Sequence, residues 1–321
     1  MNKICLIVPY FGDIPQYSNL FFKSLSNNKN IDVLLFTDTD FELSLKNLRI
    51  VHITFQELVH KIQSLFDFKI VLNAPYKLCD YRPAYGLIFK DYLKDYDFWG
   101  YCDLDIVMGD FDKFLTPEIL EKYDKIYQHG HLSLYKNTDD INREFMSSYG
   151  MDYKKVFTTS VNCVFDELFG IQQKFDHDNY KTYKSWDFFD VDPWKYHLTR
   201  VTSNVPQNIL KKDFDFKHEC FYWKNGHLCR IAADNMNLSN SEYIYFHFQK
   251  RKYIVPNNIQ SCNDFLYLTN DECLEEPKIV NNVCDIDKYN KFSSFQQINF
   301  YLKKEIFIWR RRFNKYILKK G

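Results

Sequence analysis

The sequence predicts an α/β fold, in which a mostly parallel central sheet is flanked by helices. Short apolar runs alternate with segments of helical spacing from the first residues onward, as in repeated strand–helix–strand units. The apolar runs are continuous rather than alternating, which is typical of parallel strands buried on both faces. Polar or turn-forming residues follow each run. The carboxyl ends of the strands should therefore form the edge at which such sheets bind ligands.

The elements of the first hundred residues follow from these patterns. Buried strands are predicted at residues 3–9, 31–36, 49–53 and 98–102. Helices are predicted at residues 17–25, 55–65 and 84–96, where apolar side chains recur at spacings of three and four. Three polar segments, residues 9–12, 37–38 and 103–105, should then lie together at the ligand edge of the sheet.

The pattern is less regular after residue 110. Strands are predicted at residues 123–127, 132–135, 160–165 and 243–248, and helices at residues 139–149 and 167–175. Asp166 and Glu167 should open the second of these helices. We expect one α/β domain over residues 1–255 and an extension over residues 256–321.

Composition narrows the class of protein. The net charge is zero, so nothing in it favours nucleic-acid binding. Nine cysteines are scattered without a C-x-x-C pair, which argues against a disulfide framework and fits a reducing cytoplasm. The sequence shows neither a signal-peptide layout nor an apolar run of membrane-spanning length. We expect a cytoplasmic protein, with most of its many aromatic side chains in the core.

Residues 292–321 have a different character. Aromatic and aliphatic residues there alternate with eight lysines and arginines, opposed by the single acidic residue Glu305. A basic amphipathic helix with Trp and Phe is typical of a helix that lies in an anionic membrane interface. The alternative is a terminal helix that docks on its own domain and leaves its basic face in solvent.

Two carboxylates, Asp103 and Asp105, follow the aromatic strand at residues 98–102. Where a strand bends into a loop, carboxylates two positions apart can converge on one cation. Mg²⁺ and Mn²⁺ prefer such oxygen ligands and leave positions for water or phosphate. The D-x-D pattern at this edge therefore predicts a site for a metal–diphosphate, although short acidic triplets also occur as solvated loops.

The segment KLCDYRPAYGLIFKDYLKDYDFWGYCDLDIVMGD closely resembles a signature of bacterial capsule and O-antigen glycosyltransferases, a family long described as a domain of unknown function. Four further blocks match in order: GHLSLYKNT, NCVFDELFGI, FYWKNGHLCR and EYIYFHFQKRK. The resemblance covers about residues 1–255. It implies a GT-A fold and the transfer of a sugar from a nucleotide-sugar to a lipid-linked saccharide.

The resemblance also implies a set of site residues. Asp103 and Asp105 correspond to the metal-binding pair, and His247 to the histidine that adds a third metal ligand in many GT-A enzymes. Mn²⁺ or Mg²⁺ would be the cofactor. The nucleotide-sugar would be bound by Pro9, Tyr10, Phe11, Asp38, Lys77, Asp80, Arg82, Leu104, Asn162, Lys250 and Arg251. For His247, and for the lysine and arginine residues, a purely structural or solvated role remains the alternative.

In inverting enzymes of this type, an acidic residue about 60 positions after the D-x-D pair acts as general base. Asp166 and Glu167 have that placement, and Asp166 is slightly favoured, with helix capping as its alternative role. A retaining enzyme would not need this base. His129 and His131 flank a glycine at a strand start and are weaker candidates for acceptor binding.

The leading hypothesis is a metal-dependent glycosyltransferase at the inner face of the cytoplasmic membrane. The donor would be a UDP-hexose such as UDP-galactose, in pyranose or furanose form. A nucleotidyltransferase would share the fold and the acidic site, but would show a glycine-rich phosphate loop, whereas VPYFGD has one glycine. A glycoside hydrolase could also use paired carboxylates. A sugar-binding protein without activity is a hypothesis that only an assay excludes.

Overall fold

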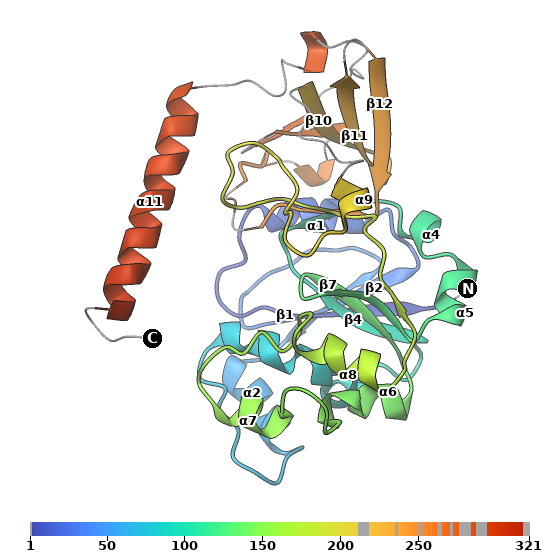
Figure 1. Cartoon of the computed structure of the whole chain (residues 1–321). Coiled ribbons are helices and arrows are strands. Elements are labelled where there is room, and N and C mark those ends of the chain that lie inside the picture. Colours follow the sequence, from blue (N-terminus) through green and yellow to red (C-terminus); the bar gives the residue numbers. More distant parts are fainter. Residues whose placement is uncertain are drawn as a thin grey trace. The chain divides into compact units, whose positions relative to one another are not determined.

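The computed structural model describes residues 2–210, 218–234, 237–249, 251, 253–257, 259–261, 265–269, 272–275, 284–286 and 294–316 (Figure 1). The chain divides into two compact units, residues 1–187 and 188–321. The boundary predicted after residue 255 lies within the second unit. The helices predicted at residues 84–96 and 139–149 are also shorter than expected, as described below.

The first unit contains a sheet of seven strands, hydrogen-bonded in the order β3-β2-β1-β4-β7-β6-β8. The strands are β1 (Ile4–Pro9), β2 (Ile31–Thr37), β3 (Leu48–His52), β4 (Phe98–Cys102), β6 (Lys125–His129), β7 (Leu132–Lys136) and β8 (Thr182–Tyr183). Strands β1 to β4 are parallel, whereas β7 runs antiparallel to both β4 and β6. The predicted α/β class with a mostly parallel central sheet is confirmed.

Helices flank this sheet (Figure 1). The α-helices of the first unit are α1 (Ser18–Leu25), α2 (Phe55–Gln63), α3 (Tyr85–Ile88), α4 (Phe111–Phe114), α5 (Pro117–Lys122), α6 (Asp139–Arg143), α7 (Tyr153–Thr158) and α8 (Ile171–His177). The 3₁₀ helices are η1 (Pro75–Ala84), η2 (Lys90–Tyr92) and η3 (Glu144–Met146). Helix α2 begins with a capping box, in which Thr54 and Glu57 bond to each other's backbone N–H groups.

The helix predicted at residues 84–96 is a short α-helix between two 3₁₀ helices. Gly86 in α3 lies so close to the core that a Cβ atom there would be 2.6 Å from the Trp99 ring. This close approach fixes the path of the chain at α3. The helix predicted at residues 139–149 also changes to 3₁₀ after Arg143.

Two predictions around residue 165 are wrong. Residues 160–165 form no strand, because the backbone N–H groups of Cys163 and Phe165 donate to the side chain of Asp80 instead of to a neighbouring strand. Helix α8 begins at Ile171, so Asp166 and Glu167 lie in the turns before it rather than in its first turn.

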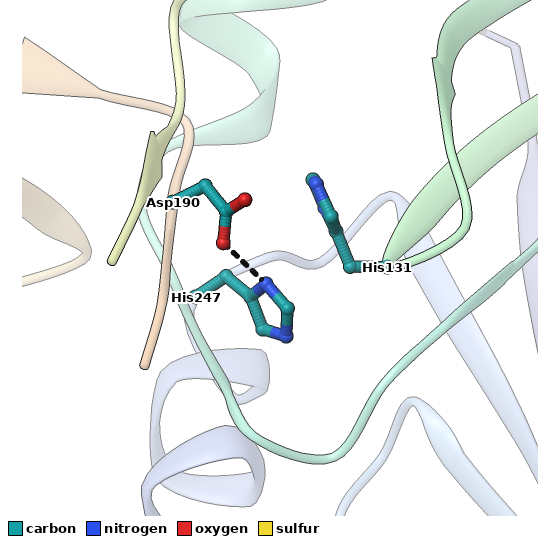
Figure 2. A group of neighbouring side chains, drawn as sticks. All are labelled: His131, Asp190 and His247. Atoms are coloured by element: carbon teal, nitrogen blue, oxygen red, sulfur yellow. Dashed lines mark hydrogen bonds and ion pairs between the residues drawn. The ribbon is translucent and has the colours of Figure 1, made fainter. Parts of the chain in front are cut away.

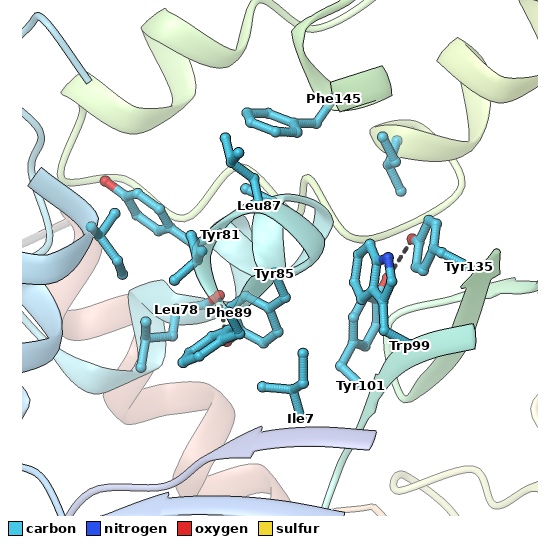
Figure 3. Close-up of a cluster of buried hydrophobic side chains, with 14 of the residues drawn as sticks. Ile7, Leu78, Tyr81, Tyr85, Leu87, Phe89, Trp99, Tyr101, Tyr135 and Phe145 are labelled. Carbon is cyan, nitrogen blue, oxygen red and sulfur yellow. Dashed lines mark hydrogen bonds between the residues drawn. The ribbon is translucent and has the colours of Figure 1, made fainter. Parts of the chain in front are cut away.

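Aromatic side chains make up much of the first unit's core (Figure 3). The rings of Trp99 and Tyr135 stack with centroids 4.5 Å apart, and the hydroxyl groups of Tyr101 and Tyr135 are 3.1 Å apart. Tyr81 stacks on Phe157 at 4.1 Å. The hydroxyl groups of these buried tyrosines have hydrogen-bond partners, as their burial requires. The expectation that most aromatic residues form the core holds for this unit.

The second unit contains a five-stranded antiparallel sheet in the order β12-β11-β10-β14-β15. Its strands are β10 (His218–Lys224), β11 (His227–Asp234), β12 (Asn237–Tyr243), β14 (Phe265–Leu268) and β15 (Cys273–Glu275). In addition, β9 (Phe189–Asp190) pairs in parallel with β13 (Tyr245–His247). The predicted strand 243–248 is therefore divided between β12 and β13.

The 23-residue helix α11 (Ser294–Tyr316) belongs to the second unit. It contacts its own unit on one side, where Lys304 Nζ donates to the carbonyl of Trp194 at 3.1 Å and the Phe307 ring lies 6.1 Å from the Trp194 ring. Among the described residues, no helix combines the length and the apolar content needed to cross a bilayer.

We expect Gly86→Ala to destabilise the first unit by about 1–3 kcal/mol, because the added methyl group overpacks the contact with Trp99. Urea denaturation followed by tryptophan fluorescence measures the change. Lys90→Ala at an exposed position nearby is the matched control and should leave the midpoint unchanged. An unchanged midpoint for Gly86→Ala would show that the core yields at this contact.

Candidate active site

The loops that follow β1 and β2 lie at the carboxyl-end edge of the parallel sheet. The backbone N–H of Gly12 donates to Asp38 Oδ1 at 2.8 Å, and the hydroxyl group of Thr39 donates to the carbonyl of Gly12 at 2.6 Å. Phe11 packs edge-on against Phe55. The structure thus connects the loop of residues 9–12 with residues 38–39, as the strand order predicts.

Asp103 and Asp105 lie in the turn between β4 and β5 (Ile106–Met108). Leu104 between them is buried, and both carboxylates are partly exposed. Tyr17, whose helical spacing indicates an ordinary core position, lies near enough to this pair to feel its charge. Burial, followed by the nearby charge of Asp105, raises the pKa of the Tyr17 phenol to about 12.

The guanidinium group of Arg82 connects Asp103 with Asp166. It forms ion pairs with Asp103 Oδ1 and, at 3.0 Å, with Asp166 Oδ2, and it donates to the carbonyl of Gly130 at 2.8 Å. Its carbon lies 5.2 Å from the centroid of the Tyr101 ring. Burial acts to lower the pKa of Arg82, but the Asp103 and Asp166 carboxylates raise it well above its ordinary value. Arg82 is therefore a permanent cation, and its charge is balanced by protein carboxylates.

Asp166 and Glu167 flank Gly130 on the β6–β7 connection. A Cβ atom at residue 130 would lie 2.7 Å from Asp166 Oδ2 and 2.8 Å from Glu167 Oε1, so only glycine leaves both carboxylates in place. Burial raises the pKa of Asp166 to about 6 against the opposing effect of Arg82. Burial, followed by the charge of Asp166, raises the pKa of Glu167 to about 7.

The two acids differ in their access to solvent. The Asp166 side chain is 5% exposed and held by Arg82, whereas the Glu167 side chain is 34% exposed. The sequence slightly favours Asp166 as the base, whereas solvent access favours Glu167. Glu167 is the better placed of the two to meet an incoming group.

The histidines on either side of Gly130 form a parallel stack, with ring centroids 5.2 Å apart. His129 Nδ1 lies 3.9 Å from Glu167 Oε2, and the His129 and Trp186 rings pack in a T-shaped arrangement. The carbonyl of His131 accepts a hydrogen bond from the backbone N–H of Asp103. The acceptor-binding candidates thus lie beside both acidic segments of the first unit.

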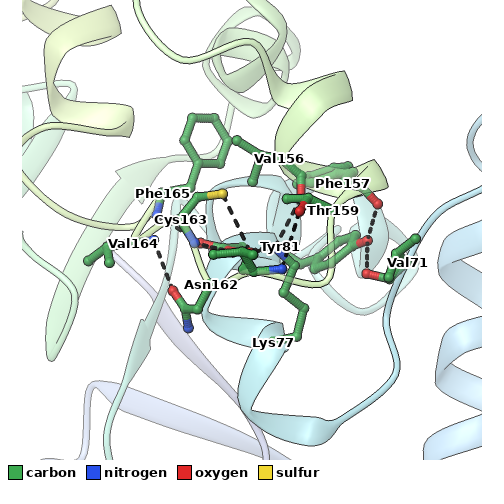
Figure 4. A network of polar contacts seen from close by, with 12 residues as sticks. Val71, Lys77, Tyr81, Val156, Phe157, Thr159, Asn162, Cys163, Val164 and Phe165 are labelled. Atoms are coloured by element: carbon green, nitrogen blue, oxygen red, sulfur yellow. Dashed lines mark hydrogen bonds and ion pairs between the residues drawn. The ribbon is translucent and has the colours of Figure 1, made fainter. Parts of the chain in front are cut away.

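Lys77, Asp80 and Asn162 bind the protein's own chain rather than standing open to a nucleotide. Figure 4 shows Lys77 and Asn162 in this network of polar contacts. Lys77 is 4% exposed, and its ammonium group donates to Asp80 and to the carbonyls of Val156 and Val161. Asp80 is fully buried, and Asn162 Oδ1 accepts from the backbone N–H of Val164. These polar groups hold the chain of residues 156–165, a role that the sequence alone does not distinguish from ligand binding.

His247 of the second unit has its ring orientation fixed by a neighbouring acid (Figure 2). Asp190 Oδ1 lies 2.8 Å from His247 Nδ1 and also accepts from Gln249 Nε2 at 2.6 Å. A neutral ring that donates through Nδ1 presents Nε2 as the atom able to coordinate a cation. Asp190 was missed, since it lies in the irregular stretch that the sequence pattern leaves unassigned.

Arg251, predicted to contact the diphosphate, is instead buried within the second unit. Its terminal nitrogens donate to the backbone carbonyls of Asp192, Lys195, Tyr196 and His197. The guanidinium group therefore stabilises the irregular loop at residues 192–197. Lys250, the other predicted diphosphate contact, lies outside the described residues.

The donor atoms of Asp103 and Asp105 in the first unit, and of His247 in the second unit, each suit a divalent cation. Asp103 and Asp105 offer carboxylate oxygens within one turn of the first unit, which suits Mg²⁺ or Mn²⁺. His247 meets the requirement on a metal-binding histidine that its second nitrogen be held by a carboxylate.

A protein-family model matches residues 6–277 of the chain, and its description is "Family of unknown function (DUF6625)". The chain belongs to the DUF6625 family. The match extends past residue 255, where the motifs recognised in the sequence end. A comparison of this DUF6625 protein with curated proteins finds no match.

Several glycosyltransferase structures are similar to this DUF6625 protein at low identity. They include an active-site mutant of LgtC, with a TM-score of 0.38 and 11% identity over 65% of this chain and 82% of that chain. Galactosyltransferase LgtC in complex with donor and acceptor sugar analogs gives a TM-score of 0.34, also at 11% identity over 65% and 82% of the two chains.

The apo-form glycosyltransferase GlyE of Streptococcus pneumoniae TIGR4 gives a TM-score of 0.33 and 10% identity over 57% of this chain and 46% of that chain. Identity and TM-score are low for all these structures, so the chemistry of the DUF6625 site is inferred from its own residues.

Proposed function

We propose that this protein is a glycosyltransferase that moves a sugar from a nucleotide-sugar to an acceptor hydroxyl group. One observation carries the proposal. Arg82 joins the D-x-D residue Asp103 to Asp166, and the partly exposed acid Glu167 follows directly. The proposed site for a metal–diphosphate and a candidate base with a pKa near neutrality would then share one edge of one sheet.

The proposed reaction is a single displacement. Glu167 accepts the proton of the acceptor hydroxyl, the acceptor oxygen forms a bond to the anomeric carbon, and the bond from that carbon to the diphosphate oxygen breaks with its electron pair on the leaving group. A divalent cation at Asp103 and Asp105 would offset the charge of that leaving group. Arg82 holds Asp103 and Asp166 in position, rather than gripping the diphosphate as its sequence position implied.

The loops after β1 and β2 are the proposed nucleotide-binding region. Tyr10 offers a ring, and Asp38 offers a carboxylate whose partner Gly12 fixes its orientation, which suits a base and the hydroxyl groups of a ribose. The proposed donor is a UDP-hexose such as UDP-galactose. A lipid-linked saccharide of capsule or O-antigen synthesis is the proposed acceptor, and His247 is a further candidate metal ligand.

Helix α11 supports a place for this reaction at a membrane surface. Its exposed apolar side chains recur at spacings of three and four and so form one stripe: Phe295, Ile298, Leu302, Ile306, Trp309 and Phe313. Phe300, Lys304 and Phe307, which face residues 194–196, lie at the same spacing on the other side of the helix. The helix thus contacts its own unit and also offers a free apolar stripe flanked by the exposed cations Lys303 and Arg310.

We expect Asp105→Asn to abolish transfer while the fold is retained, because the pair loses the anionic oxygen that a divalent cation requires. Nucleotide release is measured for UDP-, GDP-, CMP- and dTDP-sugars with Mn²⁺, and Mn²⁺ binding by electron paramagnetic resonance. Asp95→Asn, an exposed carboxylate near the other end of β4, is the matched control. Wild-type turnover by Asp105→Asn would contradict the metal assignment, and no turnover of any donor by the wild type would contradict the function.

Glu167→Gln should lower kcat by about 10²- to 10⁴-fold, the usual contribution of a general base. In the wild type, kcat should fall as the pH drops below about 7, because Glu167 becomes protonated there. This acidic limb should be absent from the variant. Full activity of Glu167→Gln with the acidic limb intact would point to a retaining mechanism.

The raised pKa of Glu167 also makes the stability of the folded protein depend on pH. Stability is favoured at low pH, whereas kcat is favoured at high pH. The folded state holds the Glu167 proton more tightly than the unfolded chain does. Its stabilising contribution is therefore complete below the ordinary value of 4.5 and is lost as the pH rises through 7.

The membrane proposal predicts that the protein sediments with phosphatidylglycerol vesicles and much less with phosphatidylcholine vesicles. Ile298→Asp/Trp309→Asp should remove this binding by placing charge in the stripe, and Lys303→Gln/Arg310→Gln should weaken it by about 1 kcal/mol per cation. Lys94→Gln/Lys154→Gln, at two exposed lysines of the first unit, is the charge-matched control. Equal sedimentation of the stripe variant and the wild type would exclude α11 as the membrane contact.

A further inference from the structure

Lys77 and Asp80 form a buried ion pair that takes no part in the proposed reaction. Their side chains are 3% and 0% exposed, and Lys77 Nζ lies 2.6 Å from Asp80 Oδ2. The ammonium group also donates to the carbonyls of Val156 and Val161, at 3.0 Å and 2.6 Å. All three of its N–H groups are therefore matched by protein acceptors, so the pair is fully satisfied without a ligand.

The Asp80 carboxylate holds the chain on both sides of Val164. Its two oxygens accept from the backbone N–H groups of Cys163 at 2.8 Å and Phe165 at 2.9 Å. Val164 between them has a φ angle of +58°, which is unusual for a β-branched residue and costs free energy. Asn162 Oδ1 fixes the same turn by accepting from the N–H of Val164.

This turn sets the position of the two acids that follow. Phe165 is fully buried, and the next residue is Asp166, whose carbonyl accepts from the hydroxyl group of Tyr101 at 3.2 Å. The 3₁₀ helix η1 carries both Asp80, which binds the backbone of residues 163–165, and Arg82, which binds the side chain of Asp166. One short helix therefore holds the segment at two points immediately before Glu167.

We propose that Lys77 and Asp80 are positioning residues, which hold the Val164 turn in its left-handed conformation and thereby place Asp166 and Glu167 for catalysis. The inference rests on the proposed function. A buried ion pair contributes little to net stability compared with apolar side chains of similar volume. The Val164 conformation adds a further cost. The ion pair and the Val164 conformation therefore add little to stability. We infer that their contribution is instead to fix the positions of Asp166 and Glu167.

Asp80→Asn is the first test. An amide of the same shape cannot accept from two N–H groups and an ammonium at once, so the turn should shift and carry Glu167 with it. A misplacement of about 1 Å costs on the order of 10²-fold in rate, and we expect a kcat loss of that size. The proposed nucleotide-binding loops after β1 and β2 are held by contacts of their own, so KM for the donor should change less than kcat.

The double variant Lys77→Met/Asp80→Asn separates position from stability. It removes the ammonium that the single variant leaves without its carboxylate, so it should unfold at a higher temperature than Asp80→Asn. Its kcat should nevertheless stay low, because the N–H groups of residues 163 and 165 still lack their shared carboxylate. A kcat that recovers together with stability would overturn the proposal.

Asn47→Ala is the matched control. The Asn47 side chain is also buried, and its amide nitrogen donates to the carbonyls of Leu25, Asn28 and Ile31, in a different part of the first unit. Its loss should destabilise the protein without changing kcat at a temperature where the variant is folded. A kcat loss equal to that of Asp80→Asn would show that general destabilisation is responsible, and the positioning role would fall.

A measurement without turnover keeps the positioning role testable if the proposed function fails. The Glu167 carboxyl group can be titrated by ¹³C NMR in each variant. Asp80→Asn should move its midpoint from about 7 towards the ordinary value of 4.5, because the displaced group gains solvent. Asn47→Ala should leave the midpoint in place. An unchanged Glu167 midpoint in Asp80→Asn would overturn the positioning role whatever reaction the protein catalyses.

Discussion

The guanidinium group of Arg82 is the interaction on which the site depends. Asp103 and Asp166 come from distant parts of the chain, and without a cation between them their charges would repel across a poorly solvated space. Because Arg82 is mostly buried and also donates to the Gly130 carbonyl, it holds the acids at fixed positions. The face of Tyr101 beneath it stabilises the same cation.

The rest of the first unit keeps that cation in place. Tyr101 lies on β4, and its hydroxyl group contacts both the hydroxyl group of Tyr135 on β7 and the backbone carbonyl of Asp166. The aromatic core therefore serves more than burial, since a chain of hydroxyl contacts runs from the middle of the sheet to the acids. A loss of packing at these rings would reach the site through displaced hydrogen bonds as well as through stability.

The sequence was informative where the fold depends on the chain's own periodicity. Continuous apolar runs located β1, β2 and β4, and the D-x-D pair was expected at the end of β4, where the structure has it. The failures share a cause: a charged residue's partner cannot be inferred from its neighbours in sequence. Asp80 and Arg82 look equivalent in the motif, yet one binds backbone amides and the other carboxylates. Asp190 and the turn at Val164 have no periodic signal at all.

The connection between Gly12, Asp38 and Thr39 has a consequence for how such a protein could change its specificity. These contacts join the loop after β1 to the loop after β2, whereas the acids are held from η1. The two loops can therefore be exchanged as one cassette, provided that both are exchanged together. If the proposed function holds, evolution or an engineer could in this way substitute the nucleotide, while the proposed catalytic acids are inherited unaltered.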